Sequence, residues 1–125
     1  MKLTVILPGS IRSKKNSKRI YKRGKFTAVL PSKAYLEWEK KARAEVSLQW
    51  PYDSPFTFIE KPVHVNAQIY YKGQQPDLSG CLESIGDAME AFLWVNDKQI
   101  YSWDGSRLYH DKENPRTELI VRYKT

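Results

Sequence analysis

The stretch QQPDLSGCLESIGDAMEAFLWVNDKQI, residues 74–100, carries two patterns at once, an apolar stripe and a line of acids. The apolar residues recur at helical spacing, which predicts an amphipathic helix over about residues 79–93 that faces a core. The stripe consists of Leu78, Cys81, Leu82, Ile85, Met89 and Phe92. On a helical wheel the opposite face holds Ser79, Glu83, Asp87 and Glu90. We therefore expect a helix packed on a core, with its acidic face turned away from that core.

Two more acids flank this predicted helix. Asp77 comes just before the first turn, where the helix dipole stabilises negative charge, and Asp97 follows the helix at the entrance to the next strand. If that helix and strand pack together, Asp77 and Asp97 can come close in space. The alternative is that these acids, like most polar residues opposite an apolar stripe, are only solvated surface residues.

Further elements follow from periodicity and turn residues on either side. Residues 2–7 favour a strand, and RIYKRGKFTAVL (19–30) favours a hairpin that turns near Gly24. Ser32 is a candidate N-cap of a helix. The residues of that helix expected to face the core are Tyr35, Trp38, Ala42 and Val46. A loop is expected at 50–55, and strands at 61–72, 99–109 and 117–123, with Asp104-Gly105 as a bulge or hairpin tip. This order predicts a single compact α+β domain spanning residues 1–125.

Positive charge is concentrated near the N-terminus. The 125 residues carry a net charge of +7, and RSKKNSKRIYKRGK (12–25) contains eight basic residues and no acid. Such a block is typical of a phosphate-binding surface. A solubility tail is the alternative, but the interleaved Ile20, Tyr21 and Phe26 argue against it, because a tail of that kind needs no apolar residues.

Composition excludes several classes of protein. No apolar run approaches the roughly 18 residues needed to span a membrane. MKLTVILPGS predicts a first strand rather than a secretory signal. The single cysteine, Cys81, excludes an internal disulfide, and together with two distant histidines it cannot assemble a zinc site of the usual kind. We therefore expect a cytoplasmic protein.

The acids and the basic block together suggest one chemistry. Mg²⁺ takes oxygen ligands, usually one or two carboxylates with water and substrate phosphate. A metal so held polarises a phosphoryl oxygen and activates water for in-line attack. In such a protein the basic residues hold a nucleic acid and the acids hold the metal that cuts it.

The sequence resembles the RusA-type Holliday junction resolvases, a family of crossover junction endodeoxyribonucleases. SKKNSKRIYKRGKFTAVLPSKAYLEWEKKA (13–42) resembles the family's N-terminal region, where a basic hairpin precedes a helix. PDLSGCLESIGDAM (76–89) followed by WVNDKQI (94–100) resembles its central motif, D-x-D-N-L-x-K-x-x-x-D-A-L and then an acidic pair before Q-V or Q-I. The resemblance implies a Mg²⁺-dependent nuclease that acts on branched DNA as a homodimer. It also implies a mixed β-sheet with flanking helices.

Carried over by position, Asp77 matches the first motif acid, Asp87 the aspartate of D-A-L, and Asp97 the second residue of the acidic pair. The chain departs from the motif at four places. The second acid is Ser79, the asparagine after it is Gly80, the lysine is Glu83, and the first of the acidic pair is Asn96.

One explanation of these departures is that a carboxylate has migrated. Glu83 lies one helical turn after Ser79 on the same face, so its longer side chain can reach the same cation. The alternative is a site that has lost activity and only binds DNA. We favour migration, because the acid appears at a compensating position. Lys98, Lys72 or an N-terminal basic residue would then replace the missing motif lysine.

The prediction from sequence is thus a Mg²⁺-dependent endonuclease that binds and cleaves four-way DNA junctions in recombination and repair. We assign catalysis to Asp77, Glu83 and Asp97, and metal binding to these three with Asp87 as an accessory ligand. The residues expected to follow DNA phosphates are Lys14, Lys15, Lys18, Arg19, Lys22, Arg23 and Lys25. Two symmetric cuts in a two-fold branched molecule favour a homodimer. The rival reading is a non-catalytic DNA- or RNA-binding protein of the same fold.

Overall fold

The computed structural model describes residues 2–12, 18–23, 26–49 and 59–123, with the backbone alone for residues 18–23 and 26–31. The predicted loop at 50–55 therefore lies outside the described residues. The elements in chain order are β1 (Lys2–Pro8), β2 (Lys18–Arg23), β3 (Phe26–Pro31), α1 (Lys33–Gln49), β4 (Val63–Tyr71), α2 (Leu78–Met89), the 3-10 turn η1 (Asp97–Gln99), β5 (Ile100–Ser102), β6 (Arg107–His110) and β7 (Arg116–Tyr123). This arrangement confirms the predicted α+β class.

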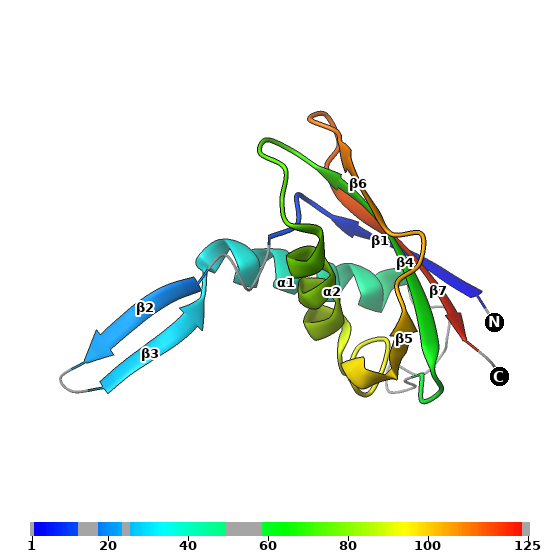
Figure 1. The fold of residues 1–125 in the computed structure, drawn as a ribbon, viewed down its shortest axis with the longest axis horizontal. Helices are drawn as coiled ribbons and strands as arrows, with labels where there is room; N and C mark the ends of the chain where they lie inside the picture. The colour runs from blue at the N-terminus through cyan, green and yellow to red at the C-terminus, as the bar shows by residue number, and fades with distance from the viewer. Residues whose placement is uncertain (1, 13–17, 24–25, 50–58, 124–125) are drawn as a thin grey trace.

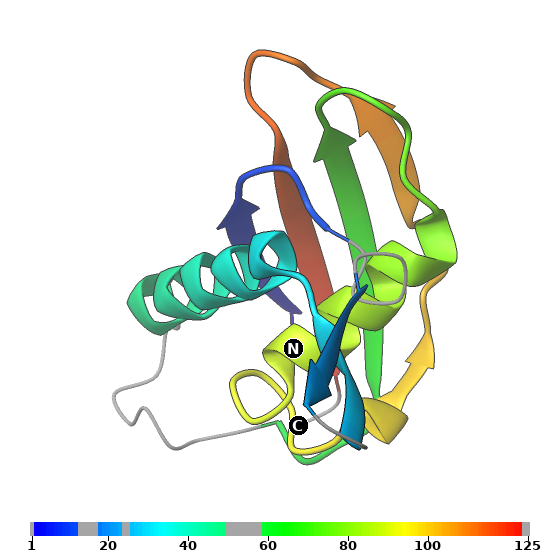
Figure 2. The ribbon, with the colours of Figure 1, turned by 90° about the vertical axis from the view of Figure 1, so that its left-hand side faces the viewer.

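A mixed five-stranded sheet forms the centre of the molecule. Strands β1, β7 and β4 are antiparallel neighbours, whereas β5 and β6 both pair in parallel with β4. Figure 1 shows α1 and α2 together on one side of this sheet, and Figure 2 shows both helices in front of its strands. The mixed sheet with two helices, expected from the family resemblance, is confirmed.

The core lies between the sheet and the two helices, and strand alternation selects its residues. Four alternate residues of β4 are fully buried, Val63, Val65, Ala67 and Ile69, whereas Tyr71 at the end of the strand is half-buried. The four residues of α1 predicted to face the core are also buried: Tyr35, Trp38, Ala42 and Val46. The N-terminus of α1 is capped as expected, since the Tyr35 amide donates to Ser32 Oγ at 3.1 Å.

The predicted basic hairpin is also present. Strands β2 and β3 pair antiparallel from Lys18 opposite Pro31 to Arg23 opposite Phe26. They form a separate two-stranded sheet, which extends away from the five-stranded sheet and its helices (Figure 1). The turn residues Gly24 and Lys25 lie outside the described residues.

Helix α2 ends at Met89, earlier than the predicted residue 93. Glu90 has an extended backbone and Ala91 a positive φ of 64°, so the chain turns sharply here. The Ala91 amide donates to the carbonyl of Trp94 at 2.7 Å, and the side chain of Trp94 is fully buried. Burial of this large indole under the helix is the physical reason why the apolar pattern continues after the helix has stopped.

The segment predicted as one strand over 99–109 is divided into β5 and β6 by a turn. Both halves run parallel to β4, so Asp104-Gly105 interrupts an edge strand and is not the tip of a hairpin. Gly105 has φ +90°, and a Cβ at this position would collide with the side chain of Asn66. Glycine is therefore required here both by conformation and by space.

Candidate functional site

The first predicted acid, Asp77, is the N-cap of α2. Its Oδ2 accepts from the Gly80 amide at 3.3 Å and from Ser79 Oγ at 3.1 Å. An N-cap carboxylate satisfies an amide that the helix leaves unpaired and interacts favourably with the helix dipole. The hydroxyl of Ser79, where the family motif has an acid, is thus turned towards the Asp77 carboxylate.

Asp97 is placed by a tightly bonded turn. It opens η1, and the Asn96 side chain caps this turn by accepting from the Lys98 amide at 2.8 Å. Gln99 closes the turn by accepting from the Asn96 amide at 2.8 Å and by donating to the carbonyl of Ile59 at 2.7 Å. The amide of Asp97 donates to Glu90 Oε1 at 3.1 Å, which ties the turn to the end of α2. The Asp97 side chain is exposed, so its position is fixed while its carboxylate stays accessible.

Gly86 lets this turn approach α2 closely. A Cβ at Gly86 would lie 3.6 Å from Asp97 Cβ and 3.9 Å from Ile100 Cδ1. Gly86 is buried, and its carbonyl accepts from Trp94 Nε1 at 3.2 Å, which anchors the helix from below. A helix position without a side chain therefore forms the floor between α2 and η1.

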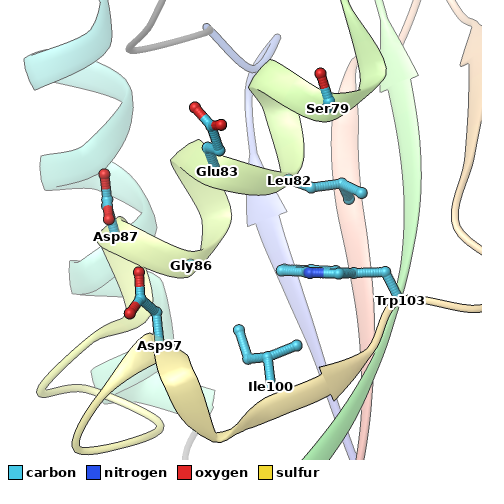
Figure 3. A pocket seen from close by; sticks show the side chains of 8 residues that line it. All are labelled: Ser79, Leu82, Glu83, Gly86, Asp87, Asp97, Ile100 and Trp103. Carbon is cyan, nitrogen blue, oxygen red and sulfur yellow. The ribbon is translucent and has the colours of Figure 1, made fainter.

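An open pocket of about 570 Å³ lies above this floor. Figure 3 shows the side chains that line it, with the carboxylates of Glu83, Asp87 and Asp97 gathered on one side. Glu83 and Asp87 stand one turn apart on α2, and Asp97 reaches the same space from η1. The full lining is Ser79, Leu82, Glu83, Gly86, Asp87, Asp97, Ile100 and Trp103.

The predicted acids are therefore only partly brought together. Glu83, Asp87 and Asp97 share the pocket, whereas the described residues that line it do not include Asp77. Asp77 caps the N-terminus of α2, and Asp97 packs beside Gly86 near the other end. At 1.5 Å rise per residue, these positions are separated by about 14 Å along the helix axis. The expected closeness of Asp77 and Asp97 is not observed.

The donor chemistry of the pocket fits a hard cation such as Mg²⁺, because its charged side chains all offer carboxylate oxygens. Within the described ranges, no group of three or more His, Cys, Asp or Glu side chains is already arranged to hold a metal ion. A cation bound here would accordingly take further oxygens from water and from a substrate phosphate, as Mg²⁺ usually does.

A polar network on α1 contacts the C-terminal part of α2. Arg43 Nε donates to the carbonyl of Ala88 at 3.0 Å, and Arg43 pairs with Glu39 at 3.1 Å. Glu39 Oε2 accepts from the Tyr35 hydroxyl at 2.6 Å. Burial, and then the neighbouring carboxylates of Glu39 and Asp87, raise the pKa of Tyr35. The acidic face of α2 is thus electrostatically coupled to α1.

Sequence reasoning missed the apolar half of the pocket and this supporting network. The ion pair of Glu39 and Arg43 lies within one helical turn, but the contact of Arg43 with Ala88 of α2 joins residues far apart in the chain. Leu82 was assigned to the core stripe, and Trp103 was only a residue of a predicted strand. No local signal shows that these two side chains face the acids.

The structure places the predicted DNA-binding residues only in part. Lys18, Arg19, Lys22 and Arg23 lie on β2, for which the backbone alone is described. Lys14, Lys15 and Lys25 lie outside the described residues. In the same described part of the chain, no helix is both long enough and apolar enough to cross a membrane.

Comparison with known proteins gives one family. The sequence model of the family described as endodeoxyribonuclease RusA matches residues 8–122, nearly the whole chain. The matched range includes the basic hairpin, both helices and every residue that lines the pocket. No curated protein matches the chain.

Proposed function

Because the chain belongs to the RusA endodeoxyribonuclease family, we propose that it is a Mg²⁺-dependent endonuclease that binds and cleaves four-way DNA junctions. The observation that carries this proposal is the shared pocket of Glu83, Asp87 and Asp97 in a chain with a net charge of +7. Three carboxylates in one open pocket repel a bare polyanion, so they need a cation if DNA is to approach them. A role in recombination and repair would follow from such a substrate.

The carboxylates of the pocket would hold the metal. Asp97 and Asp87 approach the same space from two elements, and Glu83 stands one turn from Asp87. When bound, Mg²⁺ would act as a Lewis acid on a phosphoryl oxygen and would lower the pKa of the water that it binds. Glu83, Asp87 and Asp97 are the residues that would hold such an ion, and the capped turn around Asn96 keeps Asp97 in place. Glu83 is the migrated carboxylate of this proposal, since Ser79 lines the pocket without a charge.

Asp77 remains a predicted ligand, and its role as N-cap offers a second explanation for its identity. Asparagine caps a helix about as well as aspartate does but lacks the charge that binds a metal. Asp77→Asn should therefore keep the thermal stability of the parent in either case. Loss of cleavage in a stable Asp77→Asn variant would assign Asp77 to the metal site, and unchanged cleavage would leave it as a cap alone.

The basic block at residues 12–25 would supply affinity that does not depend on DNA sequence. Each phosphate neutralised by Lys or Arg releases counterions, with a slope of about −0.9 in log affinity against log salt. Replacing Lys14, Lys15 and Lys18 together with alanine should flatten that slope by up to about 3 units. An unchanged slope would mean that the basic block at residues 12–25 points away from the DNA. We also propose a homodimer, because two symmetric cuts in a junction require two sites.

The decisive test uses a synthetic four-way junction incubated with the parent protein in Mg²⁺ or in EDTA, and with Asp97→Asn in Mg²⁺. We expect paired cuts near the branch point in Mg²⁺ only, and none with Asp97→Asn. Binding of the junction by Asp97→Asn should stay within a few-fold of the parent, because removing a negative charge does not weaken binding to a polyanion. Near-normal cleavage by Asp97→Asn would refute its assignment.

A non-catalytic DNA- or RNA-binding protein is the second candidate. The serine and glutamate at positions 79 and 83, and the absence of a ready three-ligand group among the described residues, favour it. It predicts tight junction binding with no cleavage at any Mg²⁺ concentration. Competition between branched DNA and structured RNA for the parent protein distinguishes the two versions of this candidate.

A further inference from the structure

The pocket has a second wall whose chemistry differs from that of the acids. Leu82 from α2, Ile100 from β5 and Trp103 just after β5 line it, and all three are half-buried. Figure 3 shows the indole of Trp103 extending into the pocket between Leu82 and Ile100, towards the side that holds the carboxylates. The pocket therefore combines a flat apolar surface with a cluster of negative oxygens.

The position of Trp103 is set by a rigid part of the sheet. The Ser106 amide donates to the Trp103 carbonyl at 3.1 Å and closes the turn that contains Gly105. Ser106 Oγ accepts from the Ala67 amide at 3.0 Å, which ties this turn to β4. Because β4 is a central strand, the backbone of Trp103 has a fixed place relative to the sheet, and its side chain packs against the core.

A nucleotide has the same two halves as this pocket, an aromatic base and an anionic phosphate. Base–aromatic stacking tolerates any sequence, because every base has a π-face. The volume of about 570 Å³ lies within the roughly 300–1,000 Å³ usual for small-ligand sites. A phosphate held by a cation on the acids would bring its neighbouring base towards the opposite wall.

We propose that Trp103 is a stacking platform for a nucleobase adjacent to the scissile phosphate, supplied by an unpaired or unstacked nucleotide at the branch point. This inference rests on the proposed function, because it names the part of the DNA that the same pocket takes. Leu82 and Ile100 flank the indole and exclude water from the base. Trp103 is thus a specificity-determining residue that contacts the substrate.

The matched variants separate stacking from simple packing. Trp103→Leu keeps an apolar side chain but removes the π-face, and Trp103→Phe keeps a smaller π-face. Tyr101→Leu is the control, because Tyr101 is an aromatic residue of β5, two positions before Trp103, and is 69 % exposed. Tyr101 does not belong to the residues described as lining the pocket.

The experiment measures binding to four-way junctions that carry the fluorescent base 2-aminopurine at each nucleotide flanking the branch in turn. Mg²⁺ is present so that a cation can neutralise the other acids of the pocket, and every protein also carries Asp97→Asn, for which no cleavage is expected. At one position or more, the parent and Tyr101→Leu should quench the fluorescence, Trp103→Phe should quench it in part, and Trp103→Leu should not. The junction affinity of Trp103→Leu should fall by roughly 5- to 150-fold, the loss expected for one base stack. Equal quenching and affinity for Trp103→Leu and the parent would overturn the proposal.

A measurement on the parent alone covers the case in which Trp103→Leu does not fold. An abasic nucleotide at the quenched position should weaken binding by the parent by the same factor, and unchanged binding would refute the stacking. Cleavage of the same junction in Mg²⁺ tests the proposed function separately. Cleavage without Trp103-dependent quenching overturns the stacking alone, and Trp103-dependent quenching without cleavage overturns the nuclease alone.

Discussion

Gly86→Ala should make the protein more stable and at the same time less active. Gly86 lies inside α2 with an ordinary helical backbone, and glycine there costs about 1 kcal/mol relative to alanine. The added Cβ would meet Asp97 Cβ at 3.6 Å and Ile100 Cδ1 at 3.9 Å, both ordinary van der Waals contacts. No clash therefore offsets the gain in helix propensity, and we expect the free energy of unfolding to rise by about 0.5–1 kcal/mol.

The expected change in melting temperature follows from chain length. Unfolding entropy is about 2.1 cal/mol/K per residue, which for 125 residues is about 0.26 kcal/mol/K. A gain of 0.5–1 kcal/mol then raises Tm by about 2–4 °C. Circular dichroism at 222 nm during heating measures this shift directly.

Cleavage of a four-way junction by Gly86→Ala should fall, by up to about 100-fold. The new methyl group leaves Asp97 in place but fills the floor of the pocket that Gly86 lines beside Glu83, Asp87 and Asp97. An ion and a phosphate bound there would be displaced, and a displacement of about 1 Å can cost roughly 100-fold in rate. Gly105→Ala is the control of opposite sign for stability, because its φ of +90° and its clash with Asn66 predict destabilisation. A lower Tm for Gly86→Ala, similar to that of Gly105→Ala, would refute the close but unstrained packing of Asp97 on the helix.

Three further predictions concern stability and reactivity. Arg43→Ala should lower the free energy of unfolding by about 1–2 kcal/mol in urea titrations, because it removes a charged hydrogen-bond donor to the Ala88 carbonyl of α2 from a side chain that is only 34 % exposed. Lys40→Ala, at an exposed position of the same helix, should have almost no effect. The Asn114 amide, and then the Arg116 side chain, lower the pKa of Asp111. The ionised Asp111 therefore stabilises the fold fully above about pH 4, and this stabilisation is lost as the pH falls through the depressed pKa. In urea titrations at acid pH, the difference in unfolding free energy between the parent and Asp111→Ala should shrink below about pH 4. Burial, and then the charge of Asp77, raise the pKa of Cys81 to about 12, so iodoacetamide at pH 8 should label the folded protein far more slowly than the urea-unfolded one, and equal rates would contradict its burial.

Local structure was largely predictable from the sequence. The N-cap Ser32 and the helical spacing of the buried residues of α1 predicted that helix correctly, and the strand predicted at 61–72 is present as β4. The hairpin of β2 and β3 followed from strand residues around a glycine. These features depend on residues only a few positions apart, so a short stretch of sequence is enough to predict them.

The end of α2 was not predictable in the same way. The apolar period runs on to Phe92, but the backbone leaves the helix after Met89. Leu93 and Trp94 are fully buried, and the positive φ of Ala91 permits the turn that buries them. The apolar period predicts which residues face the core. It does not predict the residue at which the helix ends, because the turn depends on burial of the Trp94 side chain.

By itself the sequence determined the α+β class, the basic hairpin, the acidic face of α2 and, through its motifs, the family. Only the tertiary structure decided which acids share a pocket. Asp97 approaches Gly86 and not Asp77, because the turn after Met89 brings η1 back beside the C-terminal half of α2. Trp103 faces the acids because β5 runs parallel to β4 beside the same helix. Both contacts join segments that are distant in the chain. Their closeness in space depends on how the elements pack around the common core, and no short stretch of sequence contains that information.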